Sequence, residues 1–135
     1  MIALPPRCRP ACLAVLVALL PATIRAQDAA APDSATVAAG RQLFEGRGLC
    51  ATCHGIAGEG MLGPTTTLHA GKTKWLHHDG SLEGVVAVIT AGVDADHSTS
   101  GQVMPPRGGS RLTDAQVRQV AAYVLHLHRK PLAPS

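Results

Sequence analysis

Residues 50–54 read Cys-Ala-Thr-Cys-His, and this short segment decides how the rest of the chain is interpreted. Two thiols at this spacing can add to the two vinyl groups of a single haem, and the histidine that follows can offer an imidazole nitrogen to the iron. Cys50 and Cys53 are therefore predicted to attach one haem covalently, and His54 is predicted to be an axial ligand of its iron.

Three other uses of this segment stay open beside haem attachment. A structural zinc site needs four ligands, and the chain offers one Cys-x-x-Cys pair. A thioredoxin-like redox pair follows a strand in a βαβ pattern, whereas this pair follows helix-like sequence and precedes a glycine-rich stretch. A disulfide across so short a loop would be strained and would stabilise the fold little. Haem attachment accounts best for the spacing together with the histidine.

A six-coordinate haem needs a second axial ligand on the face opposite His54. Met104 is the preferred candidate, because it begins the segment Met104-Pro105-Pro106, in which fixed proline φ angles can hold a thioether in place. A methionine that only fills a core is usually set in a periodic apolar helix. His69 and His97 are reserve ligands. Met61 lies close behind His54 in the same loop and is less well placed to reach the opposite face. The remaining histidines are interpreted as surface imidazoles: His77, His78, His126 and His128.

Helical periodicity lies on both sides of this segment. Ser34 is predicted to cap a first helix of about three turns that ends before Gly46. Asp79 or Ser81 is predicted to cap a second helix that ends at Gly92. Small and apolar residues form one face of each helix: Val37, Gly40, Leu43 and Phe44 in the first, and Leu82, Val85, Val86 and Ile89 in the second.

A third helix has the strongest local signals. Thr113 and Gln116 form a capping box, and apolar residues then recur at helical spacing until Pro131: Val117, Val120, Ala121, Val124 and Leu127. Residues 54–75 and 93–111 are rich in glycine and proline and are predicted to be long loops. Loops of this length are usually functional or wrapped round something. The predicted fold class is all-α, with long loops round one haem.

The composition supports a prosthetic group in the interior. A chain of 135 residues has room for one small domain, and Phe44, Trp75 and Tyr123 are its only aromatic residues. Aromatic side chains usually supply much of the apolar area of a core. A haem is a large apolar body that can take their place.

The N-terminus is typical of a secretory signal peptide. Arg7 and Arg9 precede an apolar run over residues 11–20. Residues 21–26 then lead to small residues typical of a cleavage site, and cleavage is predicted after Ala26. The run is about half of the ~20 residues that a membrane-spanning helix needs, and neither Cys8 nor Cys12 lies in a lipoprotein-type context. Export to the periplasm is expected, with residues 27–33 as a flexible linker, 34–130 as the folded domain and 131–135 as a tail.

The charge balance excludes one class of partner. Removal of the signal peptide takes away three of twelve basic residues and no acidic residue, which leaves nine of each. Haem propionates would make this neutral chain more acidic. The composition therefore gives no support for a nucleic-acid partner.

With these residues assembled, the chain from about residue 34 to 129 resembles the class I c-type cytochromes, and in particular small bacterial mono-haem members. Gly40, Phe44 and Tyr123 resemble the positions at which the terminal helices of the family cross. Gly63-Pro64 resembles the family's turn, whose proline carbonyl accepts a hydrogen bond from the ligand imidazole and fixes its tautomer. Met104-Pro105 resembles the methionine-ligand loop.

The segment from Trp75 to Leu82 resembles small bacterial cytochromes and the cytochrome subunits of periplasmic dehydrogenases. This resemblance implies that Trp75 hydrogen-bonds a haem propionate, although a half-buried core tryptophan is about as good an interpretation. The chain lacks the lysine-rich face of mitochondrial cytochromes c, so their mode of docking is not expected here.

The resemblance implies an electron carrier of a respiratory chain, with no catalytic residues of its own. The iron would cycle between Fe(II) and Fe(III) while His54 and Met104 stay bound, and redox partners would dock transiently. One alternative is an electron-accepting cytochrome subunit of a periplasmic dehydrogenase. A weaker alternative is a five-coordinate haem enzyme or gas binder, for which the sequence shows no positioned acid–base pair.

Overall fold

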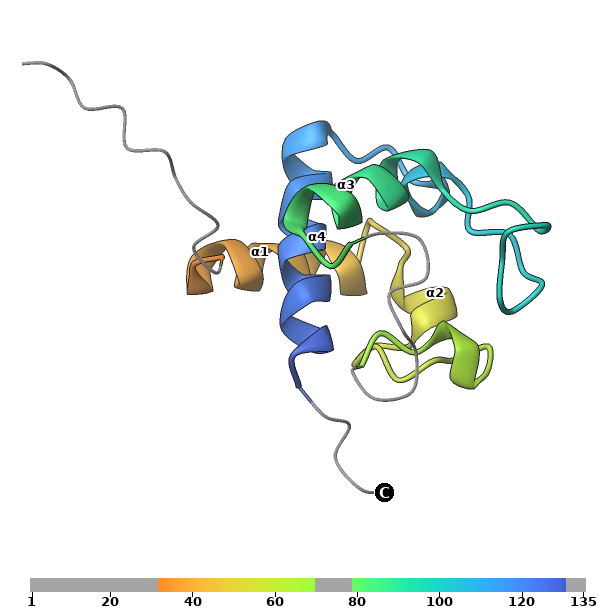
Figure 1. The fold of residues 1–135 in the computed structure, drawn as a ribbon. Helices are drawn as coiled ribbons and strands as arrows, with labels where there is room; N and C mark the ends of the chain where they lie inside the picture. The colour runs from red at the N-terminus through yellow and green to blue at the C-terminus, as the bar shows by residue number, and fades with distance from the viewer. Residues whose placement is uncertain (1–31, 70–78, 131–135) are drawn as a thin grey trace, which may run out of the picture. The chain divides into compact units, whose positions relative to one another are not determined.

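The computed structural model describes residues 32–69 and 79–130. These residues form four α-helices and two single 3₁₀ turns: α1 (Ser34–Glu45), α2 (Ala51–His54), η1 (Pro64–Thr66), α3 (Leu82–Ala91), η2 (Pro106–Gly109) and α4 (Asp114–His128). They contain no strand, and the one isolated antiparallel bridge pairs Val93 with Met104. The all-α prediction is confirmed (Figure 1). The predicted signal peptide, Trp75 and the C-terminal tail lie outside the described residues.

The caps of α3 and α4 are those that the sequence predicts. The Thr113 hydroxyl accepts a hydrogen bond from the backbone N–H of Gln116, and the Gln116 side chain accepts one from the backbone N–H of Thr113. At α3 the Ser81 hydroxyl accepts from the N–H of Gly84 at 3.0 Å. Gly92, with a φ of 75°, ends this helix. Side-chain caps of this kind supply partners for N–H groups that no helical carbonyl can reach.

The cap of α1 differs from the prediction by one residue. Asp33, not Ser34, caps this helix. Its carboxylate accepts from the backbone N–H of Thr36 at 2.9 Å and from the Thr36 hydroxyl at 2.7 Å. A charged acceptor with two oxygens makes both bonds at once and is favoured at the positive end of the helix dipole.

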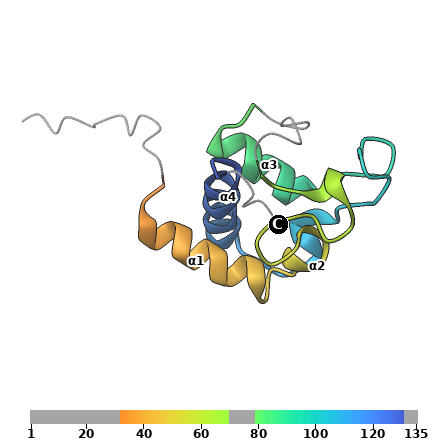
Figure 2. The same ribbon diagram turned by 90° about the horizontal axis from the view of Figure 1, so that it is seen from below.

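Helix α4 packs against both α1 and α3 (Figures 1 and 2). It crosses α1 at Gly40, where an added Cβ would lie 1.9 Å from the carbonyl oxygen of Gln119. Only glycine allows the two backbones to approach so closely. The rings of Phe44 and Tyr123 pack edge to face beside the crossing, with 5.3 Å between their centroids. The predicted crossing of the terminal helices is confirmed.

Aliphatic side chains of α3 and α4 make up most of the core. Burial of each such side chain contributes roughly 1.5–3 kcal/mol. The buried apolar cluster is Phe44, Val85, Ile89, Leu112, Val117, Val120, Ala121, Tyr123, Val124, Leu125 and Leu127. Because α4 supplies most of these residues, it is the central helix, and α1 and α3 pack against it.

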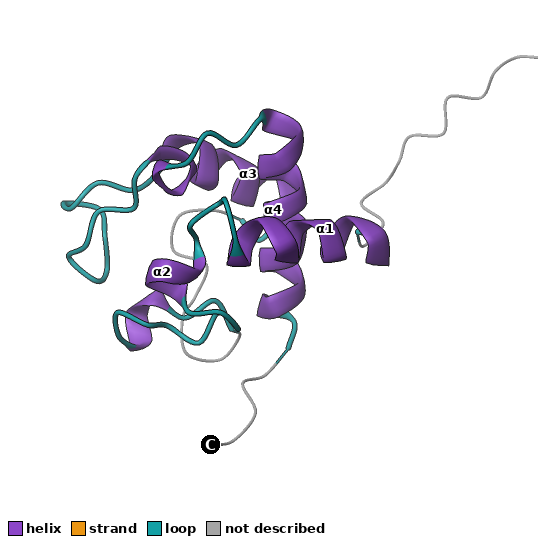
Figure 3. Cartoon of the chain, turned by 180° about the vertical axis from the view of Figure 1, so that it is seen from behind, coloured by secondary structure: helices purple, strands orange, loops and turns teal. Residues whose placement is uncertain are grey.

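Two long connections lie on one side of α4 (Figure 3). The first, after α1, contains α2 and η1, and the second, after α3, contains η2. Both were predicted as loops, and the short turns within them were not predicted because a turn of three or four residues has no periodicity to recognise. None of the helices in the described part of the chain is long and apolar enough to cross a membrane.

Candidate functional site

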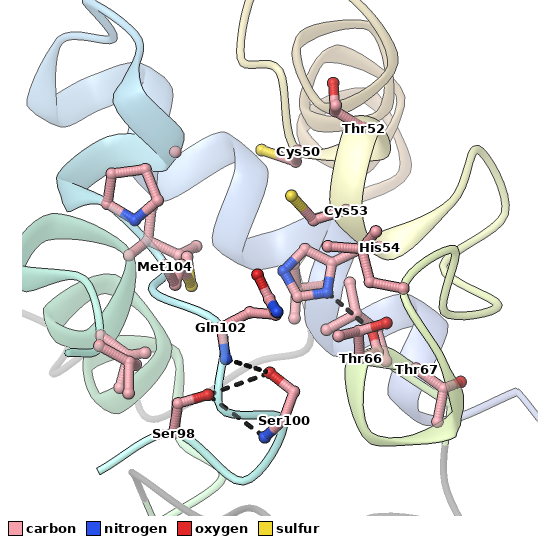
Figure 4. A pocket seen from close by; sticks show the side chains of 18 of the residues that line it. Cys50, Thr52, Cys53, His54, Thr66, Thr67, Ser98, Ser100, Gln102 and Met104 are labelled. Atoms are coloured by element: carbon pink, nitrogen blue, oxygen red, sulfur yellow. Dashed lines mark hydrogen bonds between the residues drawn. The ribbon is translucent and has the colours of Figure 1, made fainter. Parts of the chain in front are cut away.

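The segment Cys50–His54 folds into a single helical turn. The N–H groups of Cys53 and His54 both donate to the carbonyl oxygen of Cys50, at 3.3 and 3.1 Å. Residues three apart lie on the same side of a helix, so the turn places both thiols on one side. Figure 4 shows both sulfur atoms directed into the same pocket.

This pocket is a cavity of about 360 Å³ between the helices and the two long connections. Its volume lies within the roughly 300–1,000 Å³ that is usual for small-molecule and cofactor sites. One wall is the core itself, where Val85, Ile89 and Val120 face the cavity. On the loop side the cavity is lined by Leu49, Leu62 and Val103, which are about half exposed. These surfaces suit a flat apolar group.

A backbone hydrogen bond fixes the ring of His54. Its Nδ1 lies 2.7 Å from the carbonyl oxygen of Thr66, so this nitrogen donates and Nε2 is left to bind a metal. Burial lowers the pKa of the His54 imidazole, and the bond to Thr66 acts in the opposite direction. The neutral ring is thereby favoured, and this is the form that binds iron.

The acceptor of this bond differs from the prediction. The resemblance implied the carbonyl of Pro64, but the bond goes to Thr66, two residues later. Pro64 instead opens η1, and the N–H of Thr66 closes this turn on the carbonyl of Gly63 at 3.0 Å. Gly63 and Pro64 therefore act through the turn, which brings the Thr66 carbonyl to the ring.

Met104 and His54 lie on facing sides of the cavity, as Figure 4 shows. Met104 exchanges two backbone hydrogen bonds with Val93, both 2.8 Å long. Its partly buried side chain packs against the core cluster. The fold thus brings together two predicted ligands that are far apart in the sequence.

The other candidate ligands in the described residues are placed elsewhere or are already bonded. Met61 is 63% exposed and does not line the cavity. His97 is exposed and its Nδ1 lies 2.6 Å from Asp94. His69 is buried, and its ring nitrogens lie 2.8 and 2.6 Å from the carbonyl oxygens of Lys130 and Ala57. His77 and His78 lie outside the described residues.

The interpretation of His126 and His128 as surface imidazoles needs a correction at His128. His128 is half-buried and lines the cavity. His126 is half-buried with its ring stacked on Tyr123, at a centroid distance of 6.4 Å. Burial lowers the pKa of both imidazoles. The position of His128 could have been found from the sequence, because it follows Val124 by four residues and so shares its inward face.

Polar side chains that the sequence analysis missed also line the cavity. Ser98, Ser100 and Gln102 come from the connection after α3. The hydroxyl oxygens of Ser98 and Ser100 are 3.0 Å apart, and the N–H of Gln102 donates to Ser100 at 3.2 Å. Figure 4 shows Ser98 and Ser100 at the end opposite Cys50 and Cys53, and the side-chain amide of Gln102 beside the ring of His54.

These side chains fit a haem. The thiols at one end could bond the vinyl groups, the imidazole and the thioether on facing sides could hold the iron, and the hydroxyl groups at the other end could bind the propionates. Zinc fits poorly, because the described residues contain no group of three or more His, Cys, Asp or Glu side chains that could hold a metal. Burial also raises the pKa of the Cys50 thiol to about 11. This shift disfavours the thiolate, which is the form that binds zinc. No disulfide joins Cys50 and Cys53.

Comparison with known proteins leads to the same cofactor. The family model described as cytochrome c matches residues 37–128. The chain belongs to the cytochrome c family. It is 38% identical over 96 residues to cytochrome c6 of Picosynechococcus sp. (strain ATCC 27264 / PCC 7002 / PR-6), a match that covers 67% of this chain and 73% of that one.

A solved structure shares the fold. The crystal structure of cytochrome cL from the marine methylotrophic bacterium Methylophaga aminisulfidivorans MPT matches with a TM-score of 0.54 and 25% identity over 71% of this chain. The chain spans 55% of the length of that cytochrome. Together the comparisons confirm the predicted class I cytochrome c fold and a covalently bound haem c as the cofactor. As a member of the cytochrome c family, the chain is an electron-transfer protein rather than an enzyme.

Proposed function

We propose that this cytochrome is a periplasmic mono-haem electron carrier in which Cys50 and Cys53 form the thioether bonds and His54 and Met104 are the axial ligands. One observation carries the proposal: His54 and Met104 face each other across a single cavity, with both cysteine sulfurs at one of its ends (Figure 4). The bound haem supplies the Fe(II)/Fe(III) couple.

The side chains of the site restrict the chemistry to the movement of an electron. With an imidazole on one side and a thioether on the other, no position is left for a substrate. The bond from His54 to Thr66 holds the imidazole in one orientation, so little rearrangement accompanies the change of charge. A methionine ligand also favours the reduced state more than a second histidine does.

The far end of the cavity is proposed to hold the propionates. The hydroxyl groups of Ser98 and Ser100 lie there in the described structure. Trp75 stays a proposed propionate partner on the resemblance alone, since it lies outside the described residues. The serine hydroxyls would put the charged edge of the haem away from Cys50 and Cys53.

Transient docking to a redox donor and acceptor is the proposed mode of action. Three large apolar side chains line the cavity and are about half exposed: Leu49, Leu62 and Val103. A contact that combines such side chains with little charge suits partners that must dissociate after each electron. A permanent place as the electron-accepting subunit of a periplasmic dehydrogenase is the alternative, and co-purification of a stoichiometric partner from the periplasm would establish it.

The axial ligands are tested by the optical spectrum of the exported protein. The ferric form should show the weak far-red band of a methionine–iron bond, and Met104→Ala should abolish it. Met61→Ala is the matched control, because this exposed methionine does not line the cavity, and should keep the band. Loss of the band in Met61→Ala alone, or a five-coordinate wild type, would overturn the ligand assignment. Mass spectrometry of the same sample tests the attached haem and cleavage after Ala26.

A further inference from the structure

Arg107, three residues after Met104, has a backbone conformation that side chains disfavour. Its φ and ψ are 54° and 27°, in the left-handed region, and Gly108 follows with 66° and 19°. Among the described residues only Leu49 is a second non-glycine with a positive φ. A glycine would adopt this conformation without strain, so the arginine side chain must make interactions that offset it.

The guanidinium of Arg107 makes two hydrogen bonds to the start of α4. Nη1 donates to the carbonyl oxygen of Leu112 at 2.7 Å, and Nη2 donates to the carboxylate of Asp114 at 2.6 Å. The Asp114 side chain is 93% exposed, so this ion pair is weak. The bond to Leu112 is partly buried and charge-assisted, and is the stronger of the two.

The left-handed turn also brings the methionine loop against the cysteine segment. A Cβ on Gly108 would lie 2.9 Å from the carbonyl oxygen of Gly48 and 3.9 Å from the sulfur of Cys50. Within the turn, the N–H of Gly108 donates to the carbonyl of Pro105 at 2.9 Å. Met104 is thus held on one side by its bridge to Val93 and on the other by this turn.

We infer that Arg107 is a positioning residue for the methionine ligand. Its guanidinium bonds the turn after Met104 to the start of α4. These bonds keep the loop closed over the cavity, so that the thioether can reach the iron. Without the guanidinium the bridge to Val93 remains, but the chain after Met104 loses its attachment and opens more often. This inference rests on the proposed function, because it takes Met104 as the ligand.

Competition with imidazole measures how often the loop opens. Imidazole binds the ferric iron only when Met104 has left, so its apparent affinity rises in proportion to the open population. Arg107→Ala should bind imidazole about tenfold more tightly than the wild type, the factor that corresponds to a lost hydrogen bond of about 1.4 kcal/mol. Arg107→Gly should show a smaller increase, because glycine adopts the left-handed conformation without strain. Arg107→Lys should recover part of the difference, whereas Asp114→Asn should change it little.

Two control variants separate positioning from general stability. Arg118→Ala removes the ion pair of Arg118 with Glu83, between α4 and α3, and should leave imidazole affinity unchanged. Thr113→Ala weakens the start of α4 without touching the guanidinium, and should lower the melting temperature without tightening imidazole. Equal tightening in Thr113→Ala would overturn the inference, as would wild-type affinity in Arg107→Ala. A wild type with no far-red band is a different result, which removes the proposed ligation and the inference with it.

Discussion

The Nδ1 of His54 and the backbone carbonyl oxygen of Thr66 are 2.7 Å apart, although twelve residues separate them in the chain. This bond links the helical turn that carries both cysteines to the turn that begins at Gly63-Pro64. A second link from the same connection reaches the chain just after α4, since the ring of His69 lies within hydrogen-bond distance of the carbonyl oxygens of Ala57 and Lys130. The orientation of the proposed iron ligand therefore depends on Gly63 and Pro64, which form the start of the turn and do not line the cavity.

Pro64→Gly should loosen this orientation. Pro64 fixes φ at the first position of η1, and its replacement by glycine both frees the turn and increases the entropy of the unfolded chain. We expect the free energy of unfolding to fall by about 1 kcal/mol. The Nδ1–H of His54, followed by NMR, should exchange with water faster. Thr65→Ala, at an exposed position of the same turn, is the control and should change neither measurement.

Gly40→Ala should be among the most damaging single changes in the helices. Its Cβ would lie 1.9 Å from the Gln119 carbonyl oxygen, so α1 and α4 would have to move apart. Overpacking of this kind costs about 3 kcal/mol, and urea unfolding would measure it. Gly101→Ala meets no atom within 4 Å and has only the cost of its left-handed φ of 70°, about 1 kcal/mol. A smaller loss for Gly40→Ala than for Gly101→Ala would contradict the close crossing.

His69→Ala should destabilise the protein although His69 binds no iron in the proposed site. The side chain is 6% exposed, and its removal takes away the buried ring that lies against the carbonyl oxygens of Ala57 and Lys130. The loss of such a ring and of its hydrogen bond to a carbonyl oxygen costs about 1–3 kcal/mol. The far-red band should persist in the folded variant. For His97→Ala, at an exposed histidine, the free energy of unfolding should lie within about 0.5 kcal/mol of that of the wild type.

The parts of the fold that were predictable from the sequence are those specified by neighbouring residues. The capping box of Thr113 and Gln116 needs only two side chains at a fixed spacing, and Gly40 with Phe44 follows helical periodicity. The carbonyl of Thr66 has no such signature, because every residue has a carbonyl and only the geometry of η1 selects this one. Asp33 replaced Ser34 as the cap because two good acceptors lay side by side and the carboxylate makes the stronger bonds.

The surroundings of the site were harder to predict because they depend on contacts between distant segments. Ser98 and Ser100 reach the cavity only because the connection after α3 turns back towards His54. Arg107 has the left-handed conformation of a glycine because Leu112 and Asp114 bind its guanidinium. Neither arrangement has a periodicity or a motif. The cysteine–histidine segment, in contrast, carries its chemistry within five residues.

Removal of the haem should cost this protein most of its tertiary structure. Without the haem, water would enter the cavity of about 360 Å³ and reach core side chains such as Val85, Ile89 and Val120, which removes much of the small net stability of such a domain. The double variant Cys50→Ser, Cys53→Ser, which cannot form thioethers, should keep helical far-ultraviolet circular dichroism but lose its near-ultraviolet signal and bind a hydrophobic dye. Added haem should restore part of the signal without covalent attachment. A cooperative thermal transition at the wild-type temperature in the haem-free variant would show instead that the aliphatic core round α4 is sufficient by itself.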